Sequence, residues 1–207
     1  GCGKSTLALT LMGLEPPTEG VIFFDGQDVT RLGGKGLKTM RRHIQMVFQD
    51  PYESLNPLQT VGDIVSEPLK VHGLLPNKAA RAQRVSQALE DAGLKPAATF
   101  IGRYPHELSG GQRQRVVIAG ALVLDPILLL ADEPVSMLDV SIRAEILNLL
   151  AELRERRNIS ILFITHDLAT AAHFTDRIAV MYLGRIVEIG PTRQVLEHPV
   201  HPYTQAL

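Results

Sequence analysis

The stretch that decides the fold is Leu108-Ser109-Gly110-Gly111-Gln112, which lies between two halves of a nucleotide site. Upstream, the chain begins with Gly1-Cys2-Gly3-Lys4-Ser5-Thr6, and downstream an apolar run ends in Asp132-Glu133. A glycine loop and an acidic strand end together indicate a protein that binds a nucleotide and cleaves its phosphate. The five residues between them narrow that class, because two adjacent glycines at a helix start leave its backbone open to a ligand.

The glycine loop has the second half of the P-loop pattern GxxxxGK[ST]. Its glycines let backbone N–H groups approach phosphate oxygens at a helix N-terminus, which already favours anions. We expect Lys4 to reach the β- and γ-phosphates, Ser5 to place its hydroxyl on Mg²⁺, and Thr6 to add a phosphate contact. The pattern's leading glycine would precede Gly1, so the sequence is expected to be truncated at its N-terminus. The alternative is a plain glycine turn before a helix, in which Lys4 would oppose the helix dipole.

The acidic pair follows an apolar strand expected over Ile127 to Ala131. A continuously apolar strand suits the buried centre of a parallel sheet, and ligands bind at the carboxyl ends of such strands. Asp132 and Glu133 repel one another and lose solvation there, so a fold would gain little from placing them together without a functional role. The pattern predicts that Asp132 binds a metal ion and that Glu133 is the base for an attacking water. The alternative is a strand end that opens a turn at Pro134.

Composition sets the remaining bounds. The chain has 207 residues, 45% of them hydrophobic, with a formal net charge of -1, which gives no reason to expect a nucleic-acid partner. Its one cysteine, Cys2, excludes an internal disulfide and fits a reducing compartment. The longest apolar stretch, Val116 to Ala131, is interrupted by Asp125-Pro126, so no membrane-spanning segment is expected.

Alternating helical and strand patterns predict an α/β fold with a mostly parallel sheet and no internal repeat. The expected helices are 4–12, 37–42, 141–157 and 167–174, and the expected strands are 21–24, 44–48, 127–131, 159–165 and 177–183. Between 50 and 124 the pattern is helical and contains no clear strand. We therefore expect a P-loop NTPase core, formed by 1–49 and 126–207, with an inserted all-helical subdomain at 50–125.

The bland interpretation of Ser109 to Gln112 is a capping box, with Ser109 as N-cap and Gln112 three residues later. A pure cap has no use for two glycines, each of which costs a helix about 1 kcal/mol against alanine. The motif resembles the signature of the ATP-binding cassette (ABC) ATPases, whose segment closes over ATP held by the opposite subunit. The resemblance implies that Ser109, Gly110 and Gly111 contact that ATP in trans.

The resemblance extends over nearly the whole chain. Gln49 matches the glutamine that meets Mg²⁺ and water, and Asp139, in Met137-Leu138-Asp139, matches the loop that communicates between the two sites. His166 matches the histidine that senses the γ-phosphate, whereas the other histidines are expected to be packed or surface residues. The implied catalytic residues are Glu133, His166 and Gln49, and the implied metal ligands are Ser5, Gln49 and Asp132. The implied ATP-binding residues are Gly1, Cys2, Gly3, Lys4, Ser5, Thr6, Ser109, Gly110, Gly111, Gln112 and Asp139. Gly120 is a departure, since relatives usually have arginine there.

Residues 48–57 and 104–112 resemble the importers of dipeptides, oligopeptides and nickel, and 198–207 resembles the start of that subfamily's C-terminal extension. The tail alone could equally be a proline-stiffened linker. The resemblance implies an ATP-hydrolysing importer subunit that uses ATP and Mg²⁺ on the cytoplasmic face of the cell membrane. Its implied partners are a second ABC ATPase subunit, integral membrane permease subunits and, indirectly, a periplasmic or extracellular solute-binding protein. The alternatives are a non-transport ABC ATPase of translation or DNA repair, and a catalytically silent fragment.

Overall fold

The computed structural model describes residues 2–207. The elements follow in the order α1 (Lys4–Leu11), β1 (Phe23–Phe24), β2 (Gln27–Asp28), α2 (Gly34–His43), β3 (Ile44–Val47), α3 (Pro51–Ser54), α4 (Val61–Val71), α5 (Lys78–Asp91), α6 (Ala98–Ile101), the 3₁₀ helix η1 (Pro105–Glu107), α7 (Gly110–Leu122), β4 (Leu128–Asp132), α8 (Val140–Arg157), β5 (Ser160–Ile164), α9 (Leu168–Phe174), β6 (Arg177–Tyr182), β7 (Arg185–Pro191), α10 (Thr192–Glu197) and α11 (Pro202–Ala206). The α/β class predicted from the sequence is confirmed.

The central sheet has the strand order β3-β4-β5. Strands β3 and β4 are parallel, with Ile44 opposite Leu128 and Val47 opposite Ala131. Both strands are largely buried, which explains why each lacks the polar alternation of a half-exposed strand. The carboxyl ends of β3 and β4 therefore meet at one edge, where Asp132 ends β4 and Gln49 follows β3.

Two antiparallel hairpins, β1-β2 and β6-β7, come before and after the strands of the central sheet in the sequence. Strands β1 and β2 pair around the turn at Asp25-Gly26, as the turn signal predicts, although β1 begins later than the expected strand at 21. Strand β7 was not predicted. It pairs with β6 through a turn at Leu183 and Gly184, whose φ values of 46° and 79° are left-handed. The turn was not predicted because leucine rarely adopts a left-handed backbone conformation.

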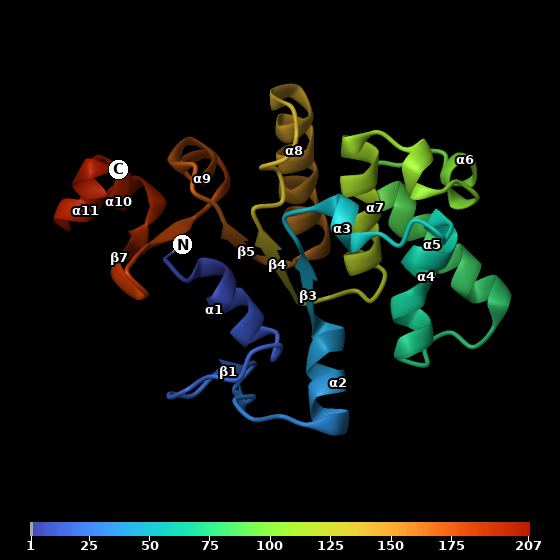
Figure 1. The fold of residues 1–207 in the computed structure, drawn as a ribbon, viewed down its shortest axis with the longest axis horizontal. Helices are drawn as coiled ribbons and strands as arrows, with labels where there is room; N and C mark the ends of the chain where they lie inside the picture. Colours follow the sequence, from blue (N-terminus) through green and yellow to red (C-terminus); the bar gives the residue numbers. More distant parts are fainter. Residues whose placement is uncertain (1) are drawn as a thin grey trace. The chain divides into compact units, whose positions relative to one another are not determined.

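Residues 50–124, all of which the structure describes, contain helices and no strand, as the sequence predicts. Helix α7 packs against α3, α4 and α5 as well as against β3, and Figure 1 shows these helices gathered on one side of that strand. Four of the helices begin with side-chain caps: backbone N–H groups in α3, α4, α5 and α7 donate to the side chains of Asp50, Thr60, Asn77 and Ser109. Within residues 2–207, no helix is long and apolar enough to cross a membrane.

The chain divides into two compact units. One comprises Gly1–Arg31 with Phe163–Leu207, and the other comprises Leu32–Leu162. The first has a small core of Ala171, Ile178, Val180 and Val195 under helices α9 and α10. The boundaries proposed from the sequence for the helical subdomain, at 50 and 125, remain a prediction.

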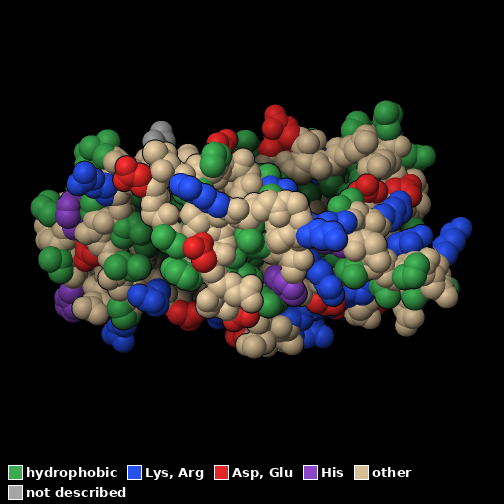
Figure 2. Space-filling view, turned by 90° about the horizontal axis from the view of Figure 1, so that it is seen from below, with side chains coloured by type: hydrophobic (Ala, Val, Ile, Leu, Met, Phe, Trp, Pro, Cys, Tyr) green, Lys and Arg blue, Asp and Glu red, His purple; other side chains and the backbone are tan. Residues whose placement is uncertain are grey.

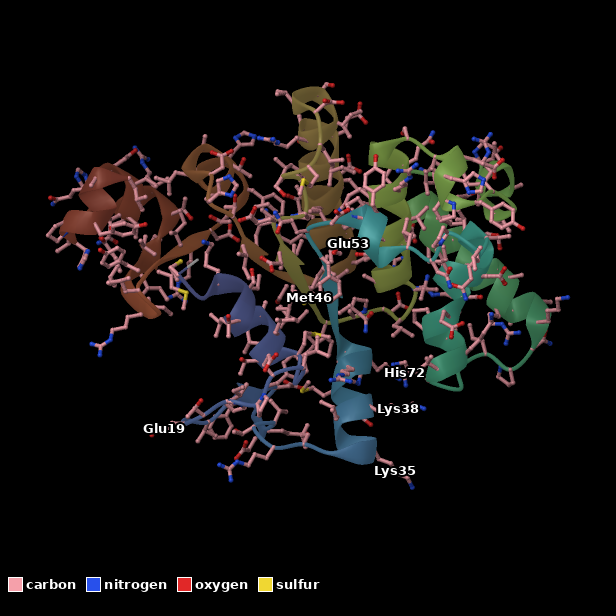
Figure 3. The ribbon with its side chains drawn as sticks, in the orientation of Figure 1. Glu19, Lys35, Lys38, Met46, Glu53 and His72 are labelled. Carbon is pink, nitrogen blue, oxygen red and sulfur yellow. The ribbon has the colours of Figure 1, made fainter. Side chains whose placement is uncertain are left out.

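Helix α2 has no acidic residue in its first turn and has Arg41, Arg42 and His43 in its last turn. Lys38 of α2 and His72 at the end of α4 lie close together (Figure 3). Burial, followed by the charges of Lys38 and Arg42, lowers the pKa of His72. Over the face drawn in Figure 2, basic, acidic and apolar side chains are interspersed, in keeping with the net charge of -1.

Candidate functional site

Gln49 and Glu133 meet at the carboxyl edge of the central sheet. The Gln49 amide Nε2 donates a hydrogen bond of 3.4 Å to Oε2 of Glu133, across 84 positions of sequence. Parallel pairing of β3 with β4 produces this meeting, because each residue lies just beyond the end of its own strand. An amide and a carboxylate that lie side by side at a strand edge can both hydrogen-bond to one water. Two residues predicted to be catalytic are thus brought together.

Glu133 has a strained backbone. Its φ of 47° lies in the left-handed region, which costs a non-glycine residue about 1–2 kcal/mol. Ser136 holds this conformation, since its backbone N–H and its Oγ donate to the Glu133 carbonyl oxygen at 3.2 and 3.0 Å. Strain of this kind persists where a side chain must be aimed, and here it turns the Glu133 carboxylate towards Gln49.

Asp132 is suited to a cation. It is only 7% exposed, and its Oδ1 has no hydrogen-bond partner within residues 2–207. A buried carboxylate oxygen without a donor is costly unless a positive ion compensates it. Among the described residues, no group of three or more His, Cys, Asp or Glu could hold a metal by itself. A metal ion at Asp132 would therefore need hydroxyl, amide, water or nucleotide oxygens to complete its ligands, as Mg²⁺ does with phosphates.

The glycine loop lies in the unit formed by the two ends of the chain, and Gly1 lies outside the described residues. Gly3 is the N-cap of α1 with φ 93°, a left-handed conformation that favours glycine, and no side chain caps this helix. The Cys2 carbonyl oxygen accepts a 3.1 Å bond from the N–H of Gly184, which anchors the loop on the β6–β7 turn. A helix start without a side-chain cap leaves N–H groups for an anion, and the exposed Ser5 and Thr6 adjoin it.

Ser109 and Gln112 form the capping box that the sequence predicts. The Gln112 N–H donates to Oγ of Ser109 at 3.3 Å, and the Ser109 N–H donates to Oε1 of Gln112 at 3.0 Å. Gly111 has a packing role that the sequence argument missed, because a Cβ at this position would lie 2.6 Å from Cγ2 of Ile142 in α8. Gly110 is looser: its nearest neighbour would be Leu138, at 3.7 Å. Packing against Ile142 therefore explains why residue 111 is glycine, whereas no packing contact explains why residue 110 is glycine.

An aromatic residue, Tyr52, and a basic residue, Arg113, form a contact near Gly110 that the sequence analysis did not predict. The Arg113 guanidinium lies over the ring of Tyr52 at 4.2 Å, and its Nε donates to the Pro105 carbonyl oxygen at 2.7 Å. This contact ties α3, just after Gln49, to the helix that starts with the signature. The position of Arg113 could have drawn attention to it, since it lies in the first turn of α7 together with the two glycines.

Asp139 and His166 lie at helix starts. Asp139 is exposed and is the N-cap of α8, but its side chain makes no cap bond. His166 is exposed and follows β5, in front of the well-capped helix α9, where Asp167 accepts from the N–H of Ala169 at 3.0 Å. Asp132, Glu133, Gln49, Asp139 and the signature belong to one unit, and the glycine loop and His166 to the other.

A glycine loop that starts a helix, and an acidic pair after a buried parallel strand, define a P-loop nucleotide-binding fold. The sequence model of the ABC transporter family matches residues 1–136 of the 207, and the chain belongs to this family. Solved structures agree. The chain superposes with a TM-score of 0.81 and 34% identity on the dimeric ATP-binding cassette MJ0796 in a post-hydrolysis state bound to ADP and Pi, covering 93% of this chain and 82% of that one. It matches cbiO1 of Clostridium perfringens, part of the transporter complex cbiONQ, with a TM-score of 0.84 and 34% identity, covering 95% and 76%.

Two relatives share more of the sequence. The chain is 51% identical over its whole length to the oligopeptide transport ATP-binding protein AppF of Bacillus subtilis. It is 54% identical over its whole length to the glutathione import ATP-binding protein GsiA of Escherichia coli. The chain spans 62% of the length of the first relative and 33% of the second. The predicted resemblance to ABC transporter ATP-binding subunits is confirmed.

Proposed function

We propose that this chain is the ATP-hydrolysing subunit of an ABC importer for peptides or a related small solute. Two copies, or this chain and a homologous partner, sandwich ATP between the glycine loop of one subunit and the signature of the other. The observation that carries the proposal is the edge of the sheet, where Gln49 contacts Glu133 and the neighbouring Asp132 has a buried Oδ1 without a partner among the described residues. The subunit acts on membrane permeases at the cytoplasmic face of the cell membrane.

In the proposed reaction, Glu133 accepts a proton from the attacking water, and Gln49 helps to orient that water. His166 orients the γ-phosphate, and Lys4 balances the charge that develops on it. Asp132, Ser5 and Gln49 would hold Mg²⁺, which supplies a positive charge at the β- and γ-phosphate oxygens. The N–H groups at the start of α1 and those of the signature bind phosphate oxygens from opposite sides.

The peptide assignment has its support in the two relatives. One is an oligopeptide transport ATP-binding protein and the other is a glutathione import ATP-binding protein, and both substrates are short peptides or peptide-like. The chain is more than half identical to each over its whole length. A solute of this class therefore fits better than a sugar, an ion or a lipid.

The action of the signature in trans is tested with purified mixed dimers. One dimer carries Ser109→Arg in one subunit and Lys4→Ala in the other, so that both lesions fall on one composite site. A second dimer carries both lesions in one subunit, which damages both sites. We expect more ATP hydrolysis from the first dimer, while dimers with a single lesion show how far the sites are coupled. If single-lesion dimers are active and the two double arrangements are equal, Ser109 does not act in trans.

The solute is tested by uptake in cells whose only copy of the protein carries Glu133→Gln. Labelled tetrapeptide, glutathione and nickel are supplied in parallel to these cells and to cells with the unchanged protein. We expect the variant cells to lose uptake of a peptide and to keep uptake of nickel. Unchanged uptake of both peptides would contradict the peptide assignment, and a selective loss of nickel uptake would replace it.

A further inference from the structure

Gln114 lies in the second turn of α7, and its side chain is fully buried, with an exposed fraction of 0%. Neither its Nε2 nor its Oε1 has a hydrogen-bond partner among residues 2–207, which the structure describes. The amide brings two donors and an acceptor into the interior, where each unmade bond costs free energy that an apolar side chain would not lose. Such a group calls for an explanation, and a partner that it meets in another state of the protein supplies one.

Helix geometry indicates where such a partner would lie. Side chains on a helix lean towards its N-terminus, so the Gln114 amide lies over the turn that contains Gly110 and Gly111. At this turn α7 touches the start of α8 and the loop of residues 136–139 that precedes it: a Cβ on Gly110 would lie 3.7 Å from Leu138, and one on Gly111 would lie 2.6 Å from Ile142.

A second unpaired group lies at the same loop. Arg143 follows Ile142 in α8, and its Nη2 donates to the Leu138 carbonyl oxygen at 3.5 Å, the outer limit of a hydrogen bond. Its Nε is buried and has no partner among the described residues. Gln114 thus has an unpaired acceptor in α7, and Arg143 has an unpaired donor in α8, the two helices that meet at Gly111 and Ile142. The two groups are chemically complementary.

We propose that Gln114 is a positioning residue for loop 136–139, and that its Oε1 accepts a hydrogen bond from the Nε–H of Arg143 when ATP joins two subunits. The inference rests on the proposed function, because this loop carries Asp139, which is expected to communicate between the two ATP sites. A bond made only in the ATP-bound dimer shifts the equilibrium towards that dimer. In the single subunit the buried, unpaired amide destabilises the fold. When the dimer closes, the new hydrogen bond removes that destabilisation and so favours the dimer.

The test replaces the amide by a side chain of similar size without polar hydrogen-bonding groups, Gln114→Met, with Gln114→Leu as a second version. In the resting protein we expect a higher urea midpoint, since a buried unpaired amide is removed. In a Glu133→Gln background, which is expected to trap ATP, we expect the dimer to dissociate about tenfold more readily, the effect of one buried hydrogen bond. Binding of ATP to the single subunit should not change.

The pairing itself is tested by a double-mutant cycle with Arg143→Met. If the two groups bond in the dimer, their combined effect on dimerisation is smaller than the product of the single effects. Multiplicative effects would overturn the pairing.

Three further outcomes separate this inference from the proposed function. If Glu133→Gln alone forms no ATP-dependent dimer, the proposed function falls, and this inference falls with it. If that parent dimerises and its Gln114→Met version dimerises equally well, the inference alone is overturned. A lower urea midpoint in both Gln114→Met and Gln114→Leu would also overturn it, because the amide would then be bonded in the resting subunit.

Discussion

Gly111 and Gly120 lie in the same helix, α7, and alanine at the two positions should have opposite effects on stability. A Cβ on Gly111 would lie 2.6 Å from Cγ2 of Ile142, whereas carbon atoms in contact prefer about 3.5–4.0 Å. A Cβ on Gly120 would meet nothing within 4 Å. The first change therefore overpacks the junction of α7 with α8, and the second adds a methyl group without a clash.

The magnitudes follow from two terms. Overpacking costs about 1–3 kcal/mol, and replacing glycine by alanine inside a helix returns at most about 1 kcal/mol. The second term is smaller at Gly111, because this residue lies in the first turn of α7. We expect Gly111→Ala to lower the free energy of unfolding by about 1–2 kcal/mol. Gly120→Ala should raise it by about 0.5–1 kcal/mol, which corresponds to about 1–4 °C in Tm.

Urea unfolding of both variants measures the two effects, with the m-value as a check that the unfolding transition itself is unchanged. A double-mutant cycle with Ile142→Ala identifies the clash, because Ile142 loses Cγ2 and the added methyl group gains room. In that background we expect Gly111→Ala to be neutral or stabilising. If Gly111→Ala is as stable as the unchanged protein, or equally harmful with and without Ile142, the packing explanation of Gly111 is wrong.

Three other perturbations test the packing and the charges of the unit 32–162. Arg157 bonds Asp125 at 2.8 Å and also pairs with Asp91, whose side chain is 13% exposed. Arg157→Met should therefore lower the free energy of unfolding by about 2 kcal/mol in the urea assay. Its exposed neighbour is the control, since Arg156→Met should change that free energy by less than about 0.5 kcal/mol. Gly93 has φ 80° and faces the Arg115 guanidinium, so Gly93→Ala should cost about 2 kcal/mol or more by the same measurement, and a neutral result would contradict both the strain and the contact. Because burial and then Lys38 and Arg42 lower the pKa of His72, charging this histidine opposes folding; stability is complete above the ordinary pKa of 6.5 and falls as the pH drops towards the lowered value. NMR titration should find a higher pKa for His72 in Lys38→Gln, and an unchanged pKa would exclude that charge as a cause.

Much of the fold could be predicted from the sequence because its signals are local. The apolar runs before Gln49 and Asp132 predict β3 and β4, and the glycine loop predicts the start of α1. Strand β7 was missed because its turn uses Leu183 in a left-handed conformation, which the residue type does not reveal. Such a turn is set by the pairing of β6 with β7 across the hairpin, and not by the turn residues alone.

The candidate site shows the same division. The family resemblance singles out Gln49 and the apolar strand pattern singles out Glu133, and the parallel pairing of their strands brings the two side chains to 3.4 Å. Spacing could not predict that Gly111 packs against Ile142, which lies 31 positions along the chain, since 142 − 111 = 31. Nor could it predict that the buried Gln114 amide lacks a partner among the described residues. Pairwise packing of α7 against α8 is a tertiary property, and no pattern within either helix encodes it.

The central claim is that Glu133 is the base of an ATPase that works as a dimer, and Glu133→Gln tests it most directly. The amide keeps the size of the side chain but cannot accept the proton of the attacking water. Phosphate release and gel filtration with ATP are measured on the variant and on the unchanged protein. We predict that the variant binds ATP, loses turnover and accumulates as an ATP-bound dimer. Near-normal hydrolysis by the variant would contradict the account.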